Sequence, residues 1–300
     1  MHAMMTFPTT RRRLAARAGR VLAAGALLAL TLTTTAQAQA VLRFTGAPQG
    51  TPEQQAARFE PLGQHLQQRL KLKAQWVPVK SEAAVLTALV SGKADLAWLD
   101  AGTLMQAEAY APGQVRPFLQ REEDQKAHSV VIVRAASPVK RLQDLKGRAF
   151  SFGPKGSATA FLMPRSALLA AKVDPAKDLA SVALAASEEA VVAAVQAGQV
   201  EAGALGQATW EALVAARQVD AAAFRVIFTS APYPDRVLAA RADTPEDSLK
   251  AIASAFLVLE AVPGGRDILK AQATRRFVEV KPESYAPVRA AAVQAGLLAK

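Results

Sequence analysis

The sequence contains no cysteine, only three histidines and few aromatic residues. Without cysteine, the chain has neither disulfides nor thiolate chemistry. Two histidines, His65 and His128, lie beyond residue 40, and His65 falls on a predicted helix where we expect it to be solvated. So few histidines predict neither a catalytic triad nor a multi-histidine metal site, and no HExxH or GxSxG motif occurs. We therefore expect a binding protein that uses no metal and no cofactor, not an enzyme.

The sequence beyond Thr33 also lacks a run of roughly 18 apolar residues, the length needed to span a bilayer. Residues 1–40 have the pattern of a cleavable signal peptide, with a basic head, a short apolar stretch from Val21 and small residues at the end. Cleavage after Ala38 and cleavage after Ala40 both fit. The run Arg11-Arg12-Arg13 leaves the twin-arginine route open beside ordinary secretion.

Acidic residues are outnumbered, with 36 Lys and Arg against 25 Asp and Glu. Removal of residues 1–40 takes five arginines and no acid, which leaves 31 basic residues against 25 acidic ones and a net charge of +6. No later segment combines clustered Lys and Arg with aromatic residues. Nucleic acid is therefore not an expected partner.

Residues 41–99 alternate between strand and helix patterns. The predicted strands are 41–45, 74–79 and 94–99, and the predicted helices begin at Thr51-Pro52-Glu53 and at Ser81. This order indicates a doubly wound α/β lobe with a mostly parallel sheet, in which ligands bind beyond the carboxyl ends of the strands. Three loops are thereby candidate binding loops, namely 46–51 with Pro48 and Gln49, 80–82 with Glu82, and 99–104 with Asp100 and Thr103.

A second series follows the same order. Its predicted strands are 129–133, 148–152, 181–184 and 200–205, and its helical segments are 139–145, 158–171 and 188–197. The segments Gly92–Ala97 and Gly198–Gly203 occupy the same place in the two series, as a repeated architecture requires. Strands at 225–228 and 237–240, separated by a proline-rich bend that contains Tyr233, then predict a return to the first lobe, where helices at 245–260, 264–273 and 284–298 end the chain.

We therefore predict two doubly wound lobes joined by two crossover strands. Residues 41–127 plus 236–300 form lobe 1, and residues 128–235 form lobe 2. Because the chain passes twice between the lobes, we expect a hinge at the two crossing segments.

The loop and helix start after Phe152 form the best-defined candidate site. Free backbone N–H groups and the helix dipole favour an anion at such a helix start, and the hydroxyls of Ser157 and Thr159 add donors. Helix capping by Ser157 alone is the alternative. The segment is not a nucleotide P-loop, because the GKS/T ending is absent.

Short motifs along the whole chain beyond residue 40 resemble the phosphate, phosphite and phosphonate-binding receptors of ABC importers, a branch of the type II periplasmic binding proteins. The motifs are Gly92–Trp98, Ser129–Val133, Ser137-Pro138, Leu142–Gly147, Phe150–Gly153, Ser157–Arg165, Phe277–Val280 and Tyr285–Arg289. The resemblance implies a monomeric periplasmic receptor that holds a small oxyanion in a cleft between lobes. Its partner would be an ABC permease in the inner membrane.

The resemblance also assigns ligand contacts. Ser157-Ala158-Thr159 stands where the family has a Ser-Thr-Ser-like helix start that binds ligand oxygens. Four other positions depart from the family, with Glu82 and Leu104 in place of aromatic residues, Glu188 in place of a frequent histidine, and His128 in place of a frequent tyrosine. The two carboxylates would repel a dianion unless they are protonated or paired. A zwitterionic or non-phosphorus ligand is therefore an alternative to a phosphorus oxyanion. A second alternative is that the protein is a ligand-sensing receptor that docks to a sensor histidine kinase.

Overall fold

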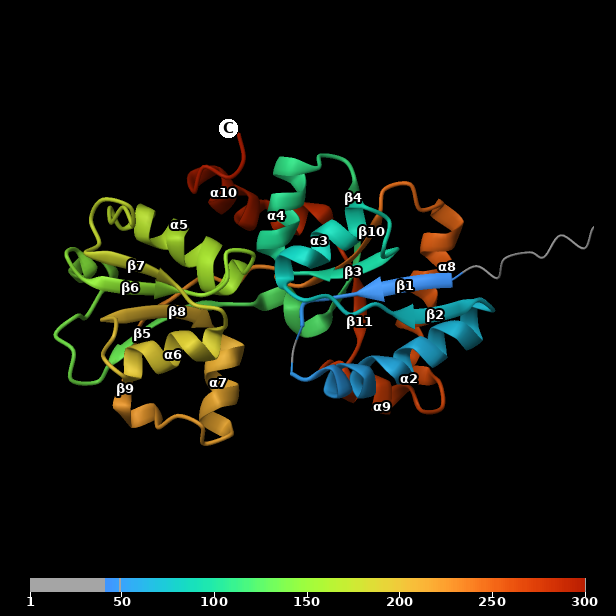
Figure 1. Cartoon of the computed structure of the whole chain (residues 1–300), viewed down its shortest axis with the longest axis horizontal. Helices are drawn as coiled ribbons and strands as arrows, with labels where there is room; N and C mark the ends of the chain where they lie inside the picture. The colour runs from blue at the N-terminus through green and yellow to red at the C-terminus, as the bar shows by residue number, and fades with distance from the viewer. Residues whose placement is uncertain (1–40, 49, 300) are drawn as a thin grey trace, which may run out of the picture. The chain divides into compact units, whose positions relative to one another are not determined.

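The computed structural model describes residues 41–48 and 50–299 (Figure 1). The predicted signal peptide, Gln49 and Lys300 lie outside the described residues. Within the described part of the chain, strands and helices form two mixed sheets with helical layers, which confirms the predicted α/β class. None of the helices described is long and apolar enough to cross a membrane.

The first sheet has six strands in the order β11-β4-β10-β3-β1-β2. The strands are β1 (Val41–Thr45), β2 (Lys73–Trp76), β3 (Leu96–Leu99), β4 (Val115–Arg121), β10 (Val237–Arg241) and β11 (Phe277–Glu279). The second sheet has five strands in the order β7-β6-β8-β5-β9. These are β5 (Ser129–Arg134), β6 (Ala149–Phe152), β7 (Ser181–Leu184), β8 (Ala202–Gly206) and β9 (Phe224–Thr229).

Both sheets contain the same arrangement of a parallel triplet followed by antiparallel strands. The triplets are β2-β1-β3 and β7-β6-β8, and β10 and β5 run antiparallel beside them. The further pairs β10 with β4, β4 with β11, and β5 with β9 are antiparallel as well. The prediction of mostly parallel sheets was therefore wrong, because β10 and β5, the first strands after the two crossings, run opposite to the triplets and pair antiparallel on both sides.

Helices cover both faces of the first sheet (Figure 1). One core joins Leu42 and Phe44 to α2 (Pro52–Leu70), α8 (Glu246–Leu257) and α9 (Gly265–Ala271). The other joins Ala97 and Leu99 to α3 (Glu82–Val90), α4 (Ala101–Tyr110) and α10 (Ala286–Gln294). Leu96 and Trp98 of β3 pack in the first core, and Ala97 and Leu99 pack in the second, because successive side chains of a strand point to opposite faces.

The second sheet is covered in the same way. Val131 and Val133 face α5 (Met163–Ala170), whereas Val130 and Ile132 face α6 (Glu188–Gln196) and α7 (Gln207–Ala215). A π-helical turn, η3 (Ala158–Leu162), precedes α5. The 3₁₀ turns are η1 (Glu122–Lys126), η2 (Leu142–Leu145), η4 (Ala221–Ala223), η5 (Leu259–Ala261) and η6 (Pro282–Tyr285).

The two glycines that close α3 and α6 support a repeated architecture. Gly92 and Gly198 each have a φ of 73°, a left-handed conformation that favours glycine. Each also lies against an arginine at the end of the antiparallel neighbour strand, Arg241 of β10 and Arg134 of β5. The same turn and the same arginine therefore recur in both series.

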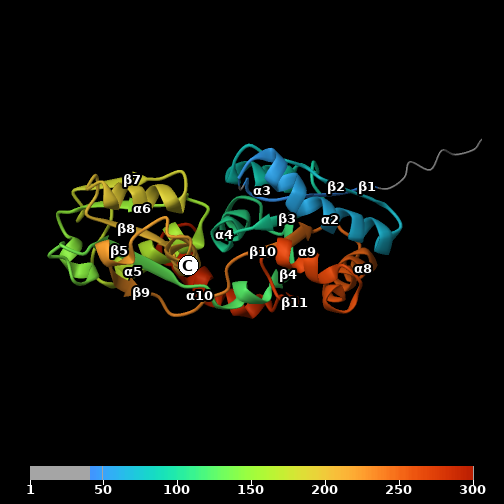
Figure 2. The ribbon, with the colours of Figure 1, turned by 90° about the horizontal axis from the view of Figure 1, so that it is seen from below.

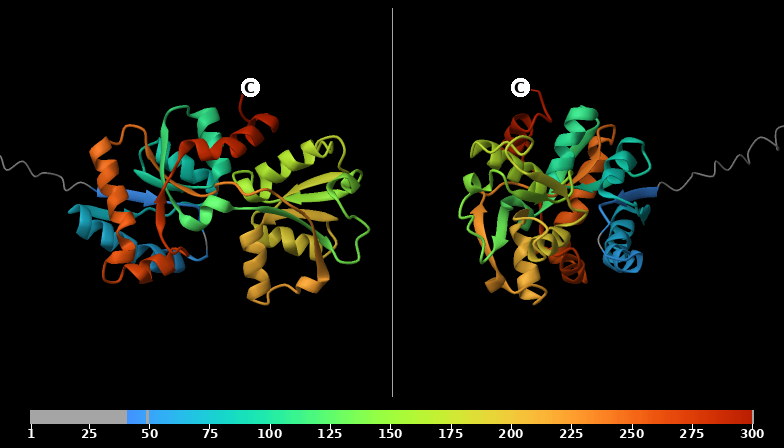
Figure 3. Two further views of the ribbon diagram at one scale, coloured as in Figure 1. Left: turned by 180° about the vertical axis from the view of Figure 1, so that it is seen from behind. Right: turned by 60° about the vertical axis from the view of Figure 1, so that its left-hand side comes forward.

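The segments that cross between the sheets run beside each other (Figures 2 and 3). Ala127 and Tyr233 exchange two backbone hydrogen bonds, of 2.8 and 3.0 Å, and form an antiparallel bridge. The two crossing segments are therefore linked by backbone hydrogen bonds at this point. The predicted lobe boundaries lie in these segments, and their action as a hinge stays a prediction.

His65 differs from its expectation. Its side chain is buried, and its Nε2 lies 2.7 Å from the carbonyl oxygen of Ala255 on α8. The prediction that His65 is solvated was therefore wrong. Helix α8, nearly two hundred residues away in sequence, packs over the face of α2 that carries His65. The predicted helix at 139–145 is also shorter than expected and comprises only η2.

Candidate functional site

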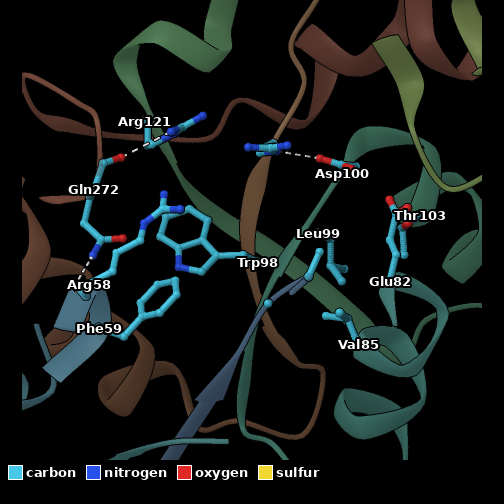
Figure 4. Close-up of a pocket in the computed structure, with 13 residues that line it drawn as sticks. Arg58, Phe59, Glu82, Val85, Trp98, Leu99, Asp100, Thr103, Arg121 and Gln272 are labelled. Carbon is cyan, nitrogen blue, oxygen red and sulfur yellow. Dashed lines mark hydrogen bonds and ion pairs between the residues drawn. The ribbon is translucent and has the colours of Figure 1, made fainter. Parts of the chain in front are cut away.

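A cavity lies at the carboxyl ends of β1 and β3 (Figure 4). Its volume is about 550 Å³, counting space open to solvent. All three candidate segments of the first series reach it, through Gly46 and Ala47, Glu82, and Asp100 with Thr103. The prediction of a loop over 99–104 was wrong for residues 101–104, because α4 begins at Ala101 directly after β3. The remaining lining residues are Arg58, Phe59, Val85, Trp98, Leu99, Arg121, Arg236 and Gln272. The parallel strands thus bring these loops to one edge of the sheet, as expected.

Three arginines from three elements line this cavity, and we call Arg58, Arg121 and Arg236 the arginine wall. Arg121 ends β4, and its Nε and Nη2 donate to the two carboxylate oxygens of Asp124, both at 2.6 Å. The Nη1 of Arg121 also donates to the carbonyl oxygen of Gln272 at 3.2 Å. The Nε of Arg236 donates to Asp100 at 2.8 Å. Bidentate and charge-assisted contacts of this kind fix a guanidinium in place.

Arg58 extends from α2 toward the other two arginines. Burial, followed by the positive charges of Arg121 and Arg236, lowers the pKa of Arg58. The cavity therefore has a positive potential on this side. An anion bound there would relieve the repulsion among the three guanidinium groups.

Carboxyl groups occupy the opposite side, where Figure 4 shows Glu82 beside Thr103. Burial and then the negative charge of Asp100 raise the pKa of Glu82 to about 9. Glu82 is therefore protonated at neutral pH. Within the described residues, its Oε1 is buried and has no hydrogen-bond partner, so this oxygen is available to a ligand group.

The pKa values of Asp100 and Asp235 are shifted in opposite directions. Burial favours the neutral form of Asp100, but the adjacent guanidinium of Arg236 outweighs it and lowers the pKa of Asp100. Burial and the charge of Asp100 raise the pKa of Asp235 well above its usual value. The carboxyl group of Asp100 thus lies on Arg236, and that of Asp124 lies on Arg121.

Ser157 and Thr159 lie at the start of η3, and their hydroxyls are engaged. The Oγ of Ser157 accepts a hydrogen bond from the N–H of Ala160 at 3.0 Å, as in helix capping. Thr159 donates to the carboxylate of Glu188 at 2.8 Å, and the two hydroxyls are 3.0 Å apart. A ligand oxygen at this helix start must therefore replace the Thr159 to Glu188 contact. π-Helical turns such as η3 are rare and often mark functional sites.

The helix start adjoins the cavity. Thr103 donates to the carbonyl oxygen of Gly156 at 3.3 Å. A side chain at Gly156 would lie 2.7 Å from Glu82, and one at Gly102 would lie 3.1 Å from the backbone nitrogen of Ala158. The structure thus brings Glu82, Asp100, Thr103, Ser157, Ala158, Thr159 and Glu188 into one neighbourhood.

The other candidates lie apart from the cavity lining. Pro48 is exposed on the loop after β1, and Gln49 is outside the described residues. The hydroxyl of Tyr233 lies 2.6 Å from that of Ser129, and the Nδ1 of His128 lies 2.8 Å from the carbonyl oxygen of Ser230. Tyr233 and His128 therefore connect the two crossing segments.

Sequence reasoning missed the arginine wall and Gln272. Arg58 lies in the middle of a long helix, and Arg121 ends a strand whose pattern Pro117 obscures. Of the three arginines, Arg236 was the easiest to predict as a site residue, because it directly follows Asp235 at the predicted crossing between lobes. No local motif links these three arginines.

Comparisons with known proteins identify relatives of this chain. The family described as ABC transporter, phosphonate, periplasmic substrate-binding protein matches residues 44–285. The probable ABC transporter phosphite binding protein PhnD1 of Prochlorococcus marinus (strain MIT 9301) is 28% identical over 178 residues. That alignment spans 57% of this chain and 60% of PhnD1.

Solved structures share the fold. The structure of Prochlorococcus marinus PhnD1 in complex with methylphosphonate has a TM-score of 0.74 and 23% identity, over 86% of this chain and 99% of that chain. The aliphatic sulphonate binding protein SsuA of Escherichia coli has a TM-score of 0.60 and 19% identity, over 87% and 89% of the two chains. These neighbours confirm the type II periplasmic binding protein fold, and the family consists of binding proteins, not enzymes. The chain belongs to the periplasmic substrate-binding proteins of phosphonate ABC transporters.

Proposed function

We propose that this chain is the receptor of an ABC importer and binds a small oxyanion of the phosphonate, phosphite or phosphate kind. The ligand would lie between the two lobes, at the cavity and the adjoining helix start. Hinge closure would bury it, and the closed monomer would dock to the permease. Secretion through the signal peptide of residues 1–40 would deliver the receptor to the periplasm.

The arginine wall is the observation that carries this proposal. Guanidinium groups bind the oxygens of phosphonates and related anions through paired N–H donors. The cavity also lies at the edge of the sheet where α/β proteins bind ligands. The names of the relatives, which refer to phosphite and methylphosphonate, support the same ligand chemistry.

A thermal-shift screen tests the ligand class. The panel contains phosphate, phosphite, phosphonates, sulfonates and amino-carboxylates. A ligand at 100 times its Kd adds about 2.7 kcal/mol to the free energy of unfolding, which raises the melting temperature measurably. We expect a shift with at least one phosphorus oxyanion. A shift with amino-carboxylates alone would contradict the proposal.

The double substitution of Ser157→Ala and Thr159→Ala should weaken binding of the hit about tenfold or more, because two hydroxyl donors are lost. Titration calorimetry measures the change. Ser187→Ala is the matched control, since the half-buried Ser187 caps α6 through Ala190 in the same way and lies outside the cavity lining. Equal affinity in the double variant and the parent chain would remove the helix start from the binding site.

The neighbouring genes test the transport role. A permease gene and an ATPase gene beside this one support an importer. A sensor kinase gene alone would contradict the transport proposal and favour a signalling receptor.

A further inference from the structure

Glu188 lies at the carboxyl ends of two parallel strands of the second sheet. The Cβ of a side chain at Gly206, the last residue of β8, would lie 3.3 Å from the Oε2 of Glu188. The Cβ of one at Gly153, directly after β6, would lie 3.8 Å from its Cγ. The two glycines thus leave room for the carboxylate at the edge of the sheet where α/β proteins bind ligands.

The same place in the first series also carries a glutamate. Glu82 and Glu188 are the first residues of α3 and α6, each directly after the serine that caps its helix. Glu82 lies against Gly156, and Glu188 accepts a hydrogen bond from Thr159. Two acids therefore reach one helix start. Glu82 adds no negative charge there at neutral pH, because burial raises its pKa to about 9.

The hydroxyl groups at this helix start donate toward Glu188. Thr159 donates its only hydroxyl proton to the Oε1 of Glu188 at 2.8 Å. In the contact of 3.0 Å between the two hydroxyls, Ser157 is therefore the donor and Thr159 the acceptor. The hydrogen bonds thus run in one direction, from Ser157 through Thr159 to the carboxylate.

A ligand oxygen that accepts from Thr159 takes this donor away from Glu188. A carboxylate only accepts hydrogen bonds, and a half-buried one without a donor is destabilising. Within residues 41–48 and 50–299, no cationic side chain forms an ion pair with Glu188. The titratable groups near it, Tyr233 and Asp235, have pKa values raised chiefly by burial and supply no positive charge. The bound ligand must therefore supply a new donor.

We infer that Glu188 selects oxyanions that carry a proton, because it accepts a hydrogen bond from a hydroxyl group of the ligand. The ligand is then a phosphorus oxyanion in its monoprotonated form, which is present because the second ionisation lies near neutral pH. One of its oxygens accepts from Thr159 while its hydroxyl donates to Glu188. A sulfonate has three oxygens but no proton, so it would leave Glu188 without a donor beside a negative charge. This inference rests on the proposed function, which brings an oxyanion to the cavity and the helix start.

Methylphosphonate and methanesulfonate test the inference, because each has a methyl group and three oxygens on a tetrahedral centre. At slightly acidic pH both carry one negative charge, but only methylphosphonate keeps a proton. The parent chain should bind methylphosphonate about tenfold or more tightly than methanesulfonate, as measured by titration calorimetry.

The Glu188→Gln variant should bind methanesulfonate more tightly than the parent chain does, because an amide group can donate to a sulfonate oxygen. Its preference for methylphosphonate should fall to about threefold or less. It should still bind methylphosphonate, since the amide oxygen accepts from the ligand hydroxyl, and this binding also shows that the variant is folded.

Glu189→Gln is the matched control, because Glu189 is the next residue of α6 and is exposed. It removes the same charge from the same helical turn. A general effect of charge on anion binding would appear in both variants, whereas we expect the control to keep the preference of the parent chain.

Two outcomes would overturn the inference while leaving the proposed function intact. One is equal binding of methylphosphonate and methanesulfonate by the parent chain. The other is a Glu188→Gln variant that keeps the full preference or weakens both ligands by the same factor, because Glu188 would then not distinguish them. Binding of no phosphorus oxyanion at all would instead contradict the proposed function.

Discussion

Replacement of Arg121 by methionine should lower the free energy of unfolding by about 3 to 5 kcal/mol. The side chains of Arg121 and Asp124 are only 15% and 8% exposed, and they share two hydrogen bonds of 2.6 Å. Methionine fills similar space but leaves the carboxylate of Asp124 without its cation inside the protein. The cost of an unpaired buried charge exceeds the small packing gain. Urea unfolding of the ligand-free chain measures the change.

Lys177→Met is the matched control. Lys177 and Asp174 have the same three-residue spacing, but the lysine side chain is 81% exposed. Exposed pairs contribute about 0 to 1 kcal/mol, so this variant should unfold almost like the parent chain. Similar losses in both variants would mean that burial of the Arg121–Asp124 pair does not determine its contribution.

Stability should decline between about pH 5 and about pH 9, with a contribution from Glu82 of up to about 1.4 kcal/mol per pH unit. Glu82 in the folded chain has a pKa of about 9, against a usual value of 4.5. Between these values the folded chain holds a proton that the unfolded chain has lost. A rise in pH through this window therefore favours unfolding, and the contribution is complete only below the lower value. Denaturant unfolding at a series of pH values measures the slope.

Glu82→Gln should flatten this decline, because glutamine keeps the shape of the protonated acid and does not ionise. Glu53→Gln is the control. Glu53 lies in the first turn of α2, as Glu82 does in α3, but its pKa is lowered by the Thr51 hydroxyl and the backbone. The control should keep the decline of the parent chain. An unchanged slope in Glu82→Gln would show that Glu82 is ionised in the folded protein.

Elements with strong local signals were predicted closely. The bounds of β1, α3 and β7 agree with the sequence prediction, because capping serines, glycine stops and alternating apolar residues mark them. The helices α4 and α7 and the strand β4 were not predicted. Asp100 and Gly206 make no side-chain cap to α4 and α7, and Pro117 interrupts the apolar pattern of β4. Tertiary packing determines these three elements.

The candidate site was predicted only in part, because local sequence signals mark some of its residues and tertiary packing alone brings in the others. The placement of Glu82, Asp100 and Thr103 beyond the ends of the strands follows from strand order, and all three residues line the cavity, although Glu82 begins α3 and Thr103 lies on α4. The arginine wall depends on contacts between residues far apart in sequence, such as Arg236 with Asp100. No spacing rule connects such residues, so a single sequence cannot reveal them.

Titration calorimetry of the chain with methylphosphonate, phosphite and phosphate tests most directly whether it is an oxyanion receptor. We expect saturable binding of at least one of these anions with one ligand per chain. We also expect weaker binding at high salt, because the arginine wall supplies part of the attraction. Absence of saturable binding to every one of these anions would contradict the assignment of an oxyanion receptor.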